Sequence, residues 1–516
     1  MNNQSTIINQ QSTIFMTALI IHGHFYQPPR ENPRTGEVEL QPSAAPYHDW
    51  NERIHAECYG PNAFACIGND ARACIVNNYA HISFNFGPTL LSWLERHQPR
   101  TYQRILNADA ESTVQRGGHG NAIAQAYGHA ILPLLNARDR LTHVIWGLQD
   151  FRYRFKRRAE SMWLPETACN NETLELLIEQ EMRFVILAPN QARRVRRLKE
   201  QTWTNVQSGA VDTTRPHRFF HRDGSRRSIA VFFYNGPLAR SIAFERALSS
   251  SKGLVERFKS VAQSGPLVNV ATDGETYGHH FKFGDLCLAH VVEEEAPEAG
   301  FDITNYAEYL DHHEPEFEVE IDNGVDGKGS SWSCSHGVGR WADNCGCQTG
   351  GEPGWNQHWR KPLREALEFL KTNADRHFEI LGADLFRNPW EARNAYINVM
   401  LDEGRSIETF IVEHCRPLSD LDRHRANTLL EIQTNSLLMF TSCGWFFSDV
   451  AGIETLQVLR YAARVIELQN QIGVASQREK FLELLAEARS NVAKEGNGAE
   501  IFKRLEVSPR ELTPVV

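Results

Sequence analysis

The sequence lacks the features of a membrane or exported protein. No apolar run reaches the roughly 18 residues that are needed to cross a bilayer. Residues 1–16 are rich in Asn, Gln, Ser and Thr and carry neither the basic segment nor the long apolar core of a signal peptide, which predicts a disordered tail. No internal repeat or low-complexity segment follows residue 17. These absences predict a soluble, cytoplasmic protein without a membrane partner.

A disulfide framework and an excess of positive charge are also missing. The ten cysteines are spread over 516 residues rather than packed into a small chain, so we expect reduced thiols. The formal net charge of −10 gives a nucleic-acid partner no electrostatic support. A basic run at residues 193–199 stands in acidic surroundings, which predicts a solvated helix or loop there.

Apolar runs of strand length alternate with helical patterns over residues 17–300. The strand candidates are residues 17–21, 82–86, 184–187, 229–234 and 267–271. Apolar residues at helical spacing predict helices that include residues 122–135 and 138–155. This alternation argues for parallel strands joined by right-handed crossovers. About seven or eight strands favour a barrel over an open sheet, and we expect this α/β barrel to occupy residues 17–300.

The pattern changes beyond residue 300. Residues 301–360 include a stretch rich in Gly, Ser, Cys and Trp with little regular periodicity. A structureless connection of this length is usually functional, so we expect a loop region over the active site. Residues 361–516 are predicted to form a separate helical domain.

Two carboxylates stand where predicted elements end. Glu166 follows Trp163-Leu-Pro165, and Asp273 follows the last clear strand and precedes a glycine. Barrel enzymes keep their chemistry at the carboxyl ends of strands. A carboxylate pair is also the minimum equipment for cleaving a glycosidic bond. The alternative is structural, with Glu166 at a helix N-terminus and Asp273 in a turn.

Five short motifs, taken in order, resemble those of glycoside hydrolase family 57. They are His22-Gly-His-Phe-Tyr-Gln-Pro28, Gly120-Asn-Ala-Ile-Ala-Gln-Ala-Tyr-Gly-His-Ala-Ile-Leu-Pro133, Trp163-Leu-Pro-Glu166, Asp273-Gly-Glu275 with Gly278-His279, and Ser330-Ser-Trp332. The segment 441–449 is similar to a divergent form of a further family segment. Phe25 and Tyr26 interrupt the family's usual His-x-His-Gln-Pro order, and residues 334–347 add an unusual Cys-rich stretch.

The resemblance implies a fold and an activity. Members of that family have an incomplete (β/α)7 barrel, similar to a TIM barrel, followed by an α-helical bundle. They hydrolyse, debranch, branch or transglycosylate α-glucans with retention, without a cofactor. This chain is therefore expected to be a retaining glycoside hydrolase or glucanotransferase acting on an α-glucan or maltooligosaccharide, with α-1,4 or α-1,6 linkages, through a glycosyl-enzyme.

By position in the motifs, Glu166 matches the family's nucleophile and Asp273 its general acid/base. For Asp273 to act as an acid near neutral pH its pKa must be raised, and Glu275 is a candidate source of the charge that raises it. The expected substrate-binding residues are His22, His24, Gln27, His129, Trp163, Glu275, His279, Trp332 and Trp445. The aromatic members are included because an indole face can stack on a pyranose.

Three alternatives stay open. Cys334, His336, Cys345 and Cys347 are zinc-ligand types, although their spacing lacks the usual Cys-x2-Cys pair and favours structural or redox-sensitive thiols without a metal. A metal-dependent barrel deacetylase or other carbohydrate hydrolase would use His22 and His24, since Gln125 stands where a second ligand to pair with His129 would be needed. A glucan-binding protein without catalysis is the third alternative.

Overall fold

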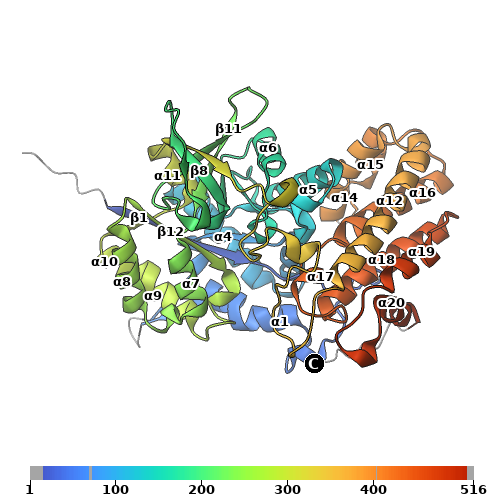
Figure 1. The fold of residues 1–516 in the computed structure, drawn as a ribbon, viewed down its shortest axis with the longest axis horizontal. Coiled ribbons are helices and arrows are strands. Elements are labelled where there is room, and N and C mark those ends of the chain that lie inside the picture. The colour runs from blue at the N-terminus through green and yellow to red at the C-terminus, as the bar shows by residue number, and fades with distance from the viewer. Residues whose placement is uncertain (1–15, 69–72, 403, 508–516) are drawn as a thin grey trace, which may run out of the picture.

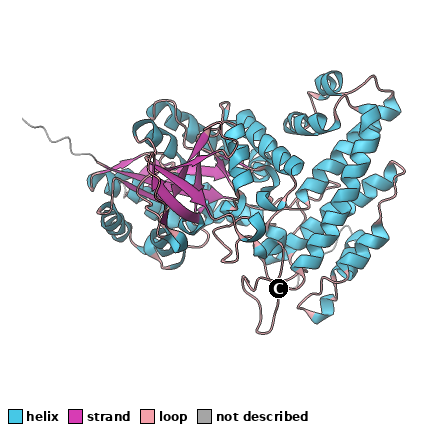
Figure 2. Ribbon diagram, turned by 45° about the horizontal axis from the view of Figure 1, so that its top comes forward, coloured by secondary structure: helices cyan, strands magenta, loops and turns pink. Residues whose placement is uncertain are grey.

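A computed structural model describes residues 16–68, 73–402 and 404–507. The predicted tail at residues 1–16 lies outside this part of the chain except for Met16. Strands gather in the amino-terminal half and helices fill the carboxyl-terminal half (Figures 1 and 2). The predicted α/β fold followed by helices is confirmed, and its strands and helices position the carboxylates as follows.

Strand β1 (Thr17–Phe25) is the centre of a parallel sheet. It pairs with β12 (Leu267–Asp273) along one edge, and with β4 (Ser83–Phe86) and β13 (Phe301–Ile303) at its two ends. Residues 18–25 are all buried, which explains why the apolar residues of β1 form a continuous run rather than alternating. The carboxyl ends of these strands therefore meet at one edge of the sheet.

Parallel pairing continues from β4 through isolated bridges. Phe84 bridges to Ala122, β5 (Ala124–Gln125) pairs with β6 (Met162–Trp163), and Ser161 bridges to Phe184. Strand β7 (Phe184–Leu187) then pairs with β11 (Ser228–Phe233). The Asn235 N–H that follows β11 donates to the Asn269 carbonyl of β12 over 2.9 Å. No ladder between β11 and β12 is seen in the described part of the chain, so a closed barrel is not established.

Helices and short strands connect these strands. They are α1 (Trp50–Ile54), α2 (Gly60–Ala63), β2 (Ala65–Ile67), β3 (Cys74–Val76), α3 (Pro88–His97), α4 (Pro99–Gln115), α5 (Ala137–Phe155), α6 (Asn171–Glu179), α7 (Gly236–Phe244), α8 (Ser251–Ala262), α9 (Gly284–His290), α10 (Ala296–Glu298) and α11 (Tyr306–His312). The predicted helix at residues 138–155 is confirmed by α5. The predicted helix at residues 122–135 is wrong, because that segment holds β5 and two short 3-10 turns.

A mixed extension, antiparallel except for the parallel pair of β10 with β14, continues from β11 through four further strands. They are β10 (His217–Phe220), β14 (Phe317–Ile321), β8 (Ala192–Arg197) and β9 (Thr204–Asn205). Strand β8 carries the basic run, so the predicted helix or loop there is wrong. Its arginines face acidic β14, with Arg194 and Arg196 paired to Glu320 and Glu318 at 2.7 Å and 2.6 Å. These cross-strand pairs of opposite charge favour the strand over a solvated loop.

The carboxyl-terminal half is helical, as predicted. Its helices are α12 (Arg360–Leu385), α13 (Pro389–Ala395), α14 (Ile397–Leu401), α15 (Ile407–His414), α16 (Asp420–Leu438), α17 (Cys443–Phe446), α18 (Ile453–Gln471), α19 (Arg478–Leu485) and α20 (Gly498–Val507). Figure 1 shows them side by side at the right of the molecule, with α17 nearest the strand-rich half.

The region between the two halves is only partly a loop. Residues 301–321 carry β13, α11 and β14, which pair with or pack on the sheets, so ordered structure extends past the predicted boundary at residue 300. Residues 322–359 contain only short 3-10 turns. The loop region therefore begins at residue 322 rather than 301, because apolar β14 residues such as Val319 and Ile321 are buried in the second sheet.

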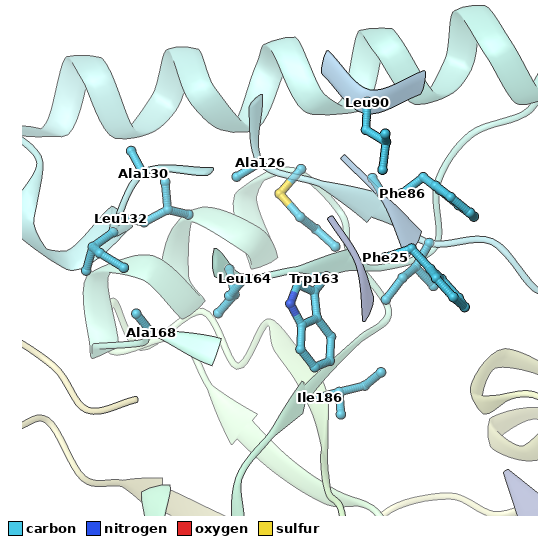
Figure 3. Packing of buried hydrophobic residues seen from close by; sticks show 14 of the residues in the cluster. Phe25, Phe86, Leu90, Ala126, Ala130, Leu132, Trp163, Leu164, Ala168 and Ile186 are labelled. Atoms are coloured by element: carbon cyan, nitrogen blue, oxygen red, sulfur yellow. The ribbon is translucent and has the colours of Figure 1, made fainter. Parts of the chain in front are cut away.

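A continuous apolar core runs beneath the strand ends. Figure 3 shows Trp163 and Leu164 from the end of β6 packed near Phe25, Phe86 and Ile186. In residues 16–68, 73–402 and 404–507, no helix is long and apolar enough to cross a membrane.

Candidate active site

The carboxyl ends of β12, β1 and β4 place polar residues in register. His24 on β1 stands opposite Asp273 on one neighbour and Asn85 on the other, and His22 stands opposite Ser83. Parallel pairing thus brings residues that lie more than 200 positions apart in the sequence to one edge, where substrate sites of α/β enzymes lie.

His22 and His24 are neutral and held by hydrogen bonds. His22 Nδ1 lies 2.9 Å from Ser83 Oγ and its Nε2 lies 3.2 Å from Asn85 Oδ1. Asn85 also contacts His24 Nδ1. Burial and the neighbouring His24 together lower the pKa of His22 to about 3, and burial lowers the pKa of His24 to about 3. Both rings are thus uncharged polar groups at neutral pH.

Aromatic rings enclose these histidines. The Trp163 ring stacks on His22 and His24 with centroids 4.7 Å and 5.0 Å apart. Trp332 meets Trp163 edge-on at 5.2 Å. Trp163 is 1% exposed whereas Trp332 is only half-buried, so Trp332 is the indole that a sugar ring could reach.

Glu166 is held in an unusual backbone conformation. It follows the turn-starting Pro165 and has φ 58° and ψ 22°, and Thr167 follows with φ 49°. Left-handed non-glycine residues cost about 1–3 kcal/mol each and cluster at functional sites. The strained turn is stabilised across the chain, because the Trp332 N–H donates to the Glu166 carbonyl over 3.1 Å.

Two donors reach the Glu166 carboxylate. Ser333 Oγ donates to Glu166 Oε2 over 2.6 Å and Trp332 Nε1 donates to the same oxygen over 3.0 Å. Desolvation raises the pKa of Glu166, while these two hydrogen bonds and the positive charge of Arg340 lower it. The donors therefore favour the ionised carboxylate.

Asp273 has the opposite environment. Its side chain is exposed to solvent, yet it is surrounded by enough protein for desolvation to raise the pKa of Asp273 well above its usual range. Negative charge on Glu275 and Glu166 raises this pKa further. No hydrogen bond to the Asp273 carboxyl is seen within the described residues. Desolvation thus raises the pKa of both carboxyls, but the two donors oppose this at Glu166 and favour its anion, whereas the contributions at Asp273 all favour the protonated acid.

Glu275 lies behind this pair. It is 7% exposed, accepts from Tyr59 Oη over 2.5 Å and accepts from the Tyr26 N–H over 3.0 Å. Desolvation raises the pKa of Glu275 to about 7, although these hydrogen bonds lower it. Its charge near Asp273 therefore changes around neutral pH.

His129 joins the site from the turn that follows β5. The residue has φ 52° and follows Gly128 at φ 72°, which turns the ring toward β1. His129 Nε2 lies 3.3 Å from His24 Nε2, and the Tyr26 ring stacks on His129 with centroids 3.8 Å apart. Ser442 Oγ, from the segment before α17, contacts His129 Nδ1 at 2.7 Å.

Residues 52–322 match the model of the glycosyl hydrolase family 57, which covers more than half of the 516 residues. This chain belongs to glycoside hydrolase family 57. Residues 355–514 match a second model, a domain of unknown function (DUF3536). No curated protein sequence matches significantly.

Solved structures share the fold of this family 57 chain at low identity. An exo-type maltose-forming amylase from Pyrococcus sp. ST04 is 15% identical, with a TM-score of 0.66, over 91% of this chain and 82% of its own. The family 57 branching enzyme from Pyrococcus horikoshii is 14% identical, with a TM-score of 0.56, over 97% and 98% of the two chains. A 4-alpha-glucanotransferase from Thermococcus litoralis is 16% identical, with a TM-score of 0.52, over 88% and 60%.

Three predicted substrate-binding residues of this family 57 chain have other contacts in the structure. Gln27 accepts from Arg30 over 2.8 Å. His279 pairs with Glu57 and meets Trp50 edge-on. Trp445 is completely buried and donates to the Arg360 carbonyl, so it packs in the core and its ring is not open to a sugar. The other six lie with Glu166 and Asp273.

Sequence reasoning missed three residues of the site. Asn85 joins the two histidines, Tyr26 stacks on His129, and Ser333 binds Glu166. Tyr26 falls at the point where the first motif departs from the family pattern, and Ser333 directly follows the fifth motif. These two places in the motifs are the sequence signals that could have singled out Tyr26 and Ser333.

The contacts of the histidine rings argue against the alternative of a metal-dependent hydrolase with His22 as a ligand. Both ring nitrogens of His22 are already in contact with Ser83 and Asn85, and Gln125 Oε1 accepts from Asn85. The cysteine cluster is different. The structure brings Cys334, His336, Cys345 and Cys347 together, with their ligand atoms within 4.8 Å of one another.

Proposed function

We propose that this chain is a retaining enzyme acting on α-glucans, with Glu166 as nucleophile and Asp273 as general acid/base. The observation that carries the proposal is the contrast between the two carboxyls. Two hydrogen bonds favour ionised Glu166, while desolvation and negative charge favour protonated Asp273. A retaining mechanism requires the two carboxyl groups to lie about 5–5.5 Å apart.

The reaction would be a double displacement. Asp273 donates its proton to the glycosidic oxygen while Glu166 attacks the anomeric carbon, which forms a glycosyl-enzyme and releases the leaving sugar. The ionised Asp273 then takes a proton from water or from a sugar hydroxyl, and that oxygen displaces Glu166. Water as acceptor gives hydrolysis, and a sugar as acceptor gives transfer or branching.

The surrounding residues would bind the sugar at the cleaved bond. His24 stands opposite Asp273, His129 contacts His24, and both rings are neutral polar groups, while His22 is buried two residues before His24 on β1. Half-buried Trp332 offers a ring face next to Glu166, and Trp163 supports it. The names of the similar structures, a maltose-forming amylase, a branching enzyme and a 4-alpha-glucanotransferase, favour an α-glucan as substrate.

The scaffold that we infer is an incomplete (β/α)7 barrel. The parallel pairings run in the order β12, β1, β4, β5, β6, β7 and β11, and the hydrogen bond from Asn235 to Asn269 joins the last strand to the first. We assign the barrel to residues 17–300 with β13, α11 and β14 packed on its sheets, the loop region over the site to residues 322–359, and the helical domain to the chain from Arg360 onward.

The test is product analysis after incubation with maltoheptaose and with amylose. The wild-type chain should convert them, and Glu166→Gln and Asp273→Asn should lose that conversion, the latter by about 10²–10⁴-fold as expected for a general acid. Exposed Glu487→Gln, a matched change away from the site, should keep wild-type activity.

The product pattern then decides the reaction. Longer or branched glucans that disappear with Glu166→Gln identify a transferase, and short sugars alone identify a hydrolase. No conversion of any α-glucan by wild type would reject the substrate, and conversion that survives Glu166→Gln would reject the mechanism.

A further inference from the structure

Four metal-ligand side chains converge in the loop that follows Ser333. Cys334 Sγ lies 3.8 Å from Cys345 Sγ and 3.8 Å from Cys347 Sγ, and Cys347 Sγ lies 3.5 Å from His336 Nδ1. Zinc binds thiolate sulfur at about 2.3 Å and imidazole nitrogen at about 2.0–2.1 Å in a tetrahedron. The edges of such a tetrahedron are about 3.8 Å between two sulfurs and about 3.6 Å between sulfur and nitrogen. The cluster therefore has the spacing of a Cys3His zinc site.

A disulfide does not account for this arrangement. A bonded pair of sulfurs lies about 2.05 Å apart, and the ten cysteines here are free. Cys334 is at the same distance from two other sulfurs, so no single pair is singled out. One disulfide would also leave a third thiol and the imidazole of His336 without a role.

The backbone of the loop is shaped to aim the side chains inward. Gly346, between Cys345 and Cys347, has φ +81°, which lets the chain turn between the two thiols. A Cβ on Gly339 would lie 3.0 Å from Cys345 Cβ, so the glycine permits the two arms of the loop to approach. Between residues 322 and 359 the regular structure consists of short 3-10 turns and the bridge of Ser330 to Cys169, so regular hydrogen bonding does little to hold the part of the loop that carries the four ligands.

A buried guanidinium stands beside the cluster. Arg360 is 0% exposed and donates from Nη1 to the Cys347 carbonyl over 2.7 Å. Three thiolates with one Zn²⁺ carry a net charge of −1. A nearby arginine is the partner that such a buried charge needs, and the bond to the ligand's own carbonyl orients the loop.

We propose that Cys334, His336, Cys345 and Cys347 bind one Zn²⁺ that fixes the loop carrying Trp332 and Ser333 against Glu166. All four positions of the tetrahedron are filled by protein, which is typical of structural rather than catalytic zinc. The first metal ligand, Cys334, directly follows Ser333. The Ser333 hydroxyl donates to the Glu166 carboxylate over 2.6 Å. The role of the metal is thus to position the donors of the carboxylate, not to react.

The experiment measures metal in the untagged full-length chain, purified under reducing conditions. Elemental analysis should find one zinc per chain in the wild type and in Cys66→Ser, which alters an exposed cysteine on β2. The double variant Cys345→Ser, Cys347→Ser should lose it. Wild-type chain exchanged into Co²⁺ should show thiolate-to-cobalt charge transfer and the visible bands of tetrahedral cobalt, even if the double variant does not fold.

Three outcomes would overturn the proposal: a reduced wild type that binds neither Zn²⁺ nor Co²⁺, metal content unchanged in the double variant, or a mass that reveals a disulfide within the cluster. These readouts need no glucan conversion, so their outcome is independent of whether the proposed reaction is correct. If the double variant folds, limited proteolysis within residues 334–354 should become faster while its helical circular dichroism stays that of wild type.

Discussion

Ser333 sets the ionisation of Glu166. Its hydroxyl lies 2.6 Å from the carboxylate oxygen and lowers the pKa of a group that desolvation raises. Ser333→Ala should lower kcat by about 10–100-fold, since hydrogen bonds to charged groups contribute about 1.5–3 kcal/mol. Because the pKa of Glu166 then rises, the acid limb of the pH profile should move to higher pH. The pH profile of kcat/KM measures this shift.

The matched control for Ser333 is Ser264→Ala, which alters an exposed serine far along the chain. It should leave both the rate and the acid limb unchanged. A Ser333→Ala enzyme whose acid limb coincides with that of wild type would show that Glu166 is not the group that must be ionised.

Glu275 should control the alkaline limb. Its negative charge raises the pKa of Asp273, and its own pKa of about 7 means that it is charged above neutral pH. Glu275→Gln keeps an oxygen for Tyr59 but removes the charge, so the pKa of Asp273 should fall. Asp273 would then lose its proton earlier, and the alkaline limb of kcat/KM should move to lower pH. An unmoved limb would exclude this coupling.

At the scale of single residues the sequence predicted those that end strands or follow a proline. Glu166 and Asp273 were singled out in this way and by the motif resemblance, whereas the β1 histidines were singled out by the resemblance, and their roles stay predictions. Asn85 and Ser333 were not found, because their roles come only from contacts made over long sequence separations. Trp445 is completely buried, and a sequence alone does not distinguish a tryptophan of the core from one that binds a sugar.

At the scale of elements, the segment 122–135 shows how tertiary contacts override periodicity. Its apolar residues are spaced as in a helix, but the chain forms β5 and then turns at Gly128 and His129, both with positive φ. Ala130 bridges to Thr441, and the Ser442 N–H donates to the His129 carbonyl over 3.0 Å. Partners 300 residues away satisfy this backbone in place of helical hydrogen bonds.

A buried ion cluster joins α5 to α12 and α13. Asp139 accepts from Arg393 at 2.7 Å and lies 3.1 Å from Lys371 Nζ. All three side chains are at most 5% exposed. Asp139→Asn leaves two buried cations with one partner fewer, which should lower the free energy of unfolding by about 3–5 kcal/mol. Equilibrium unfolding in urea measures this difference in the free energy of unfolding.

The pH dependence of that contribution follows from the pKa of Asp139. Burial raises this pKa, but Lys371 and Arg393 lower it to about 2 overall, below the value of about 3.9 for an unfolded aspartate. The stabilisation is therefore complete above pH about 4 and is lost as the pH falls through about 2. Exposed Glu365→Gln on α12 is the control and should change little. Equal stability of Asp139→Asn and wild type would contradict the assignment.

At the scale of the whole molecule, the helical half completes the site. Besides Ser442, ion pairs join Arg460 to Glu39 and Arg34 to Glu467, both at 2.7 Å. These contacts connect α18 to the segment that follows β1. The alternation of strands and helices predicted the α/β class and the helical tail, because each depends on local patterning. The pairing order and the contacts between the halves depend on packing that no local pattern encodes.

The measurement that tests the central claim most directly is the anomeric form of the first product. With maltoheptaose, proton NMR in the first minutes should show the α-anomer at the new reducing end, or at the new linkage if transfer occurs. Glu166→Ala with azide should yield a β-glycosyl azide. Azide would then attack the anomeric carbon from the side on which the Glu166 carboxylate stands in the wild type. A β-anomer formed first by the wild-type enzyme would contradict the account, because Glu166 could not then be the nucleophile of a double displacement.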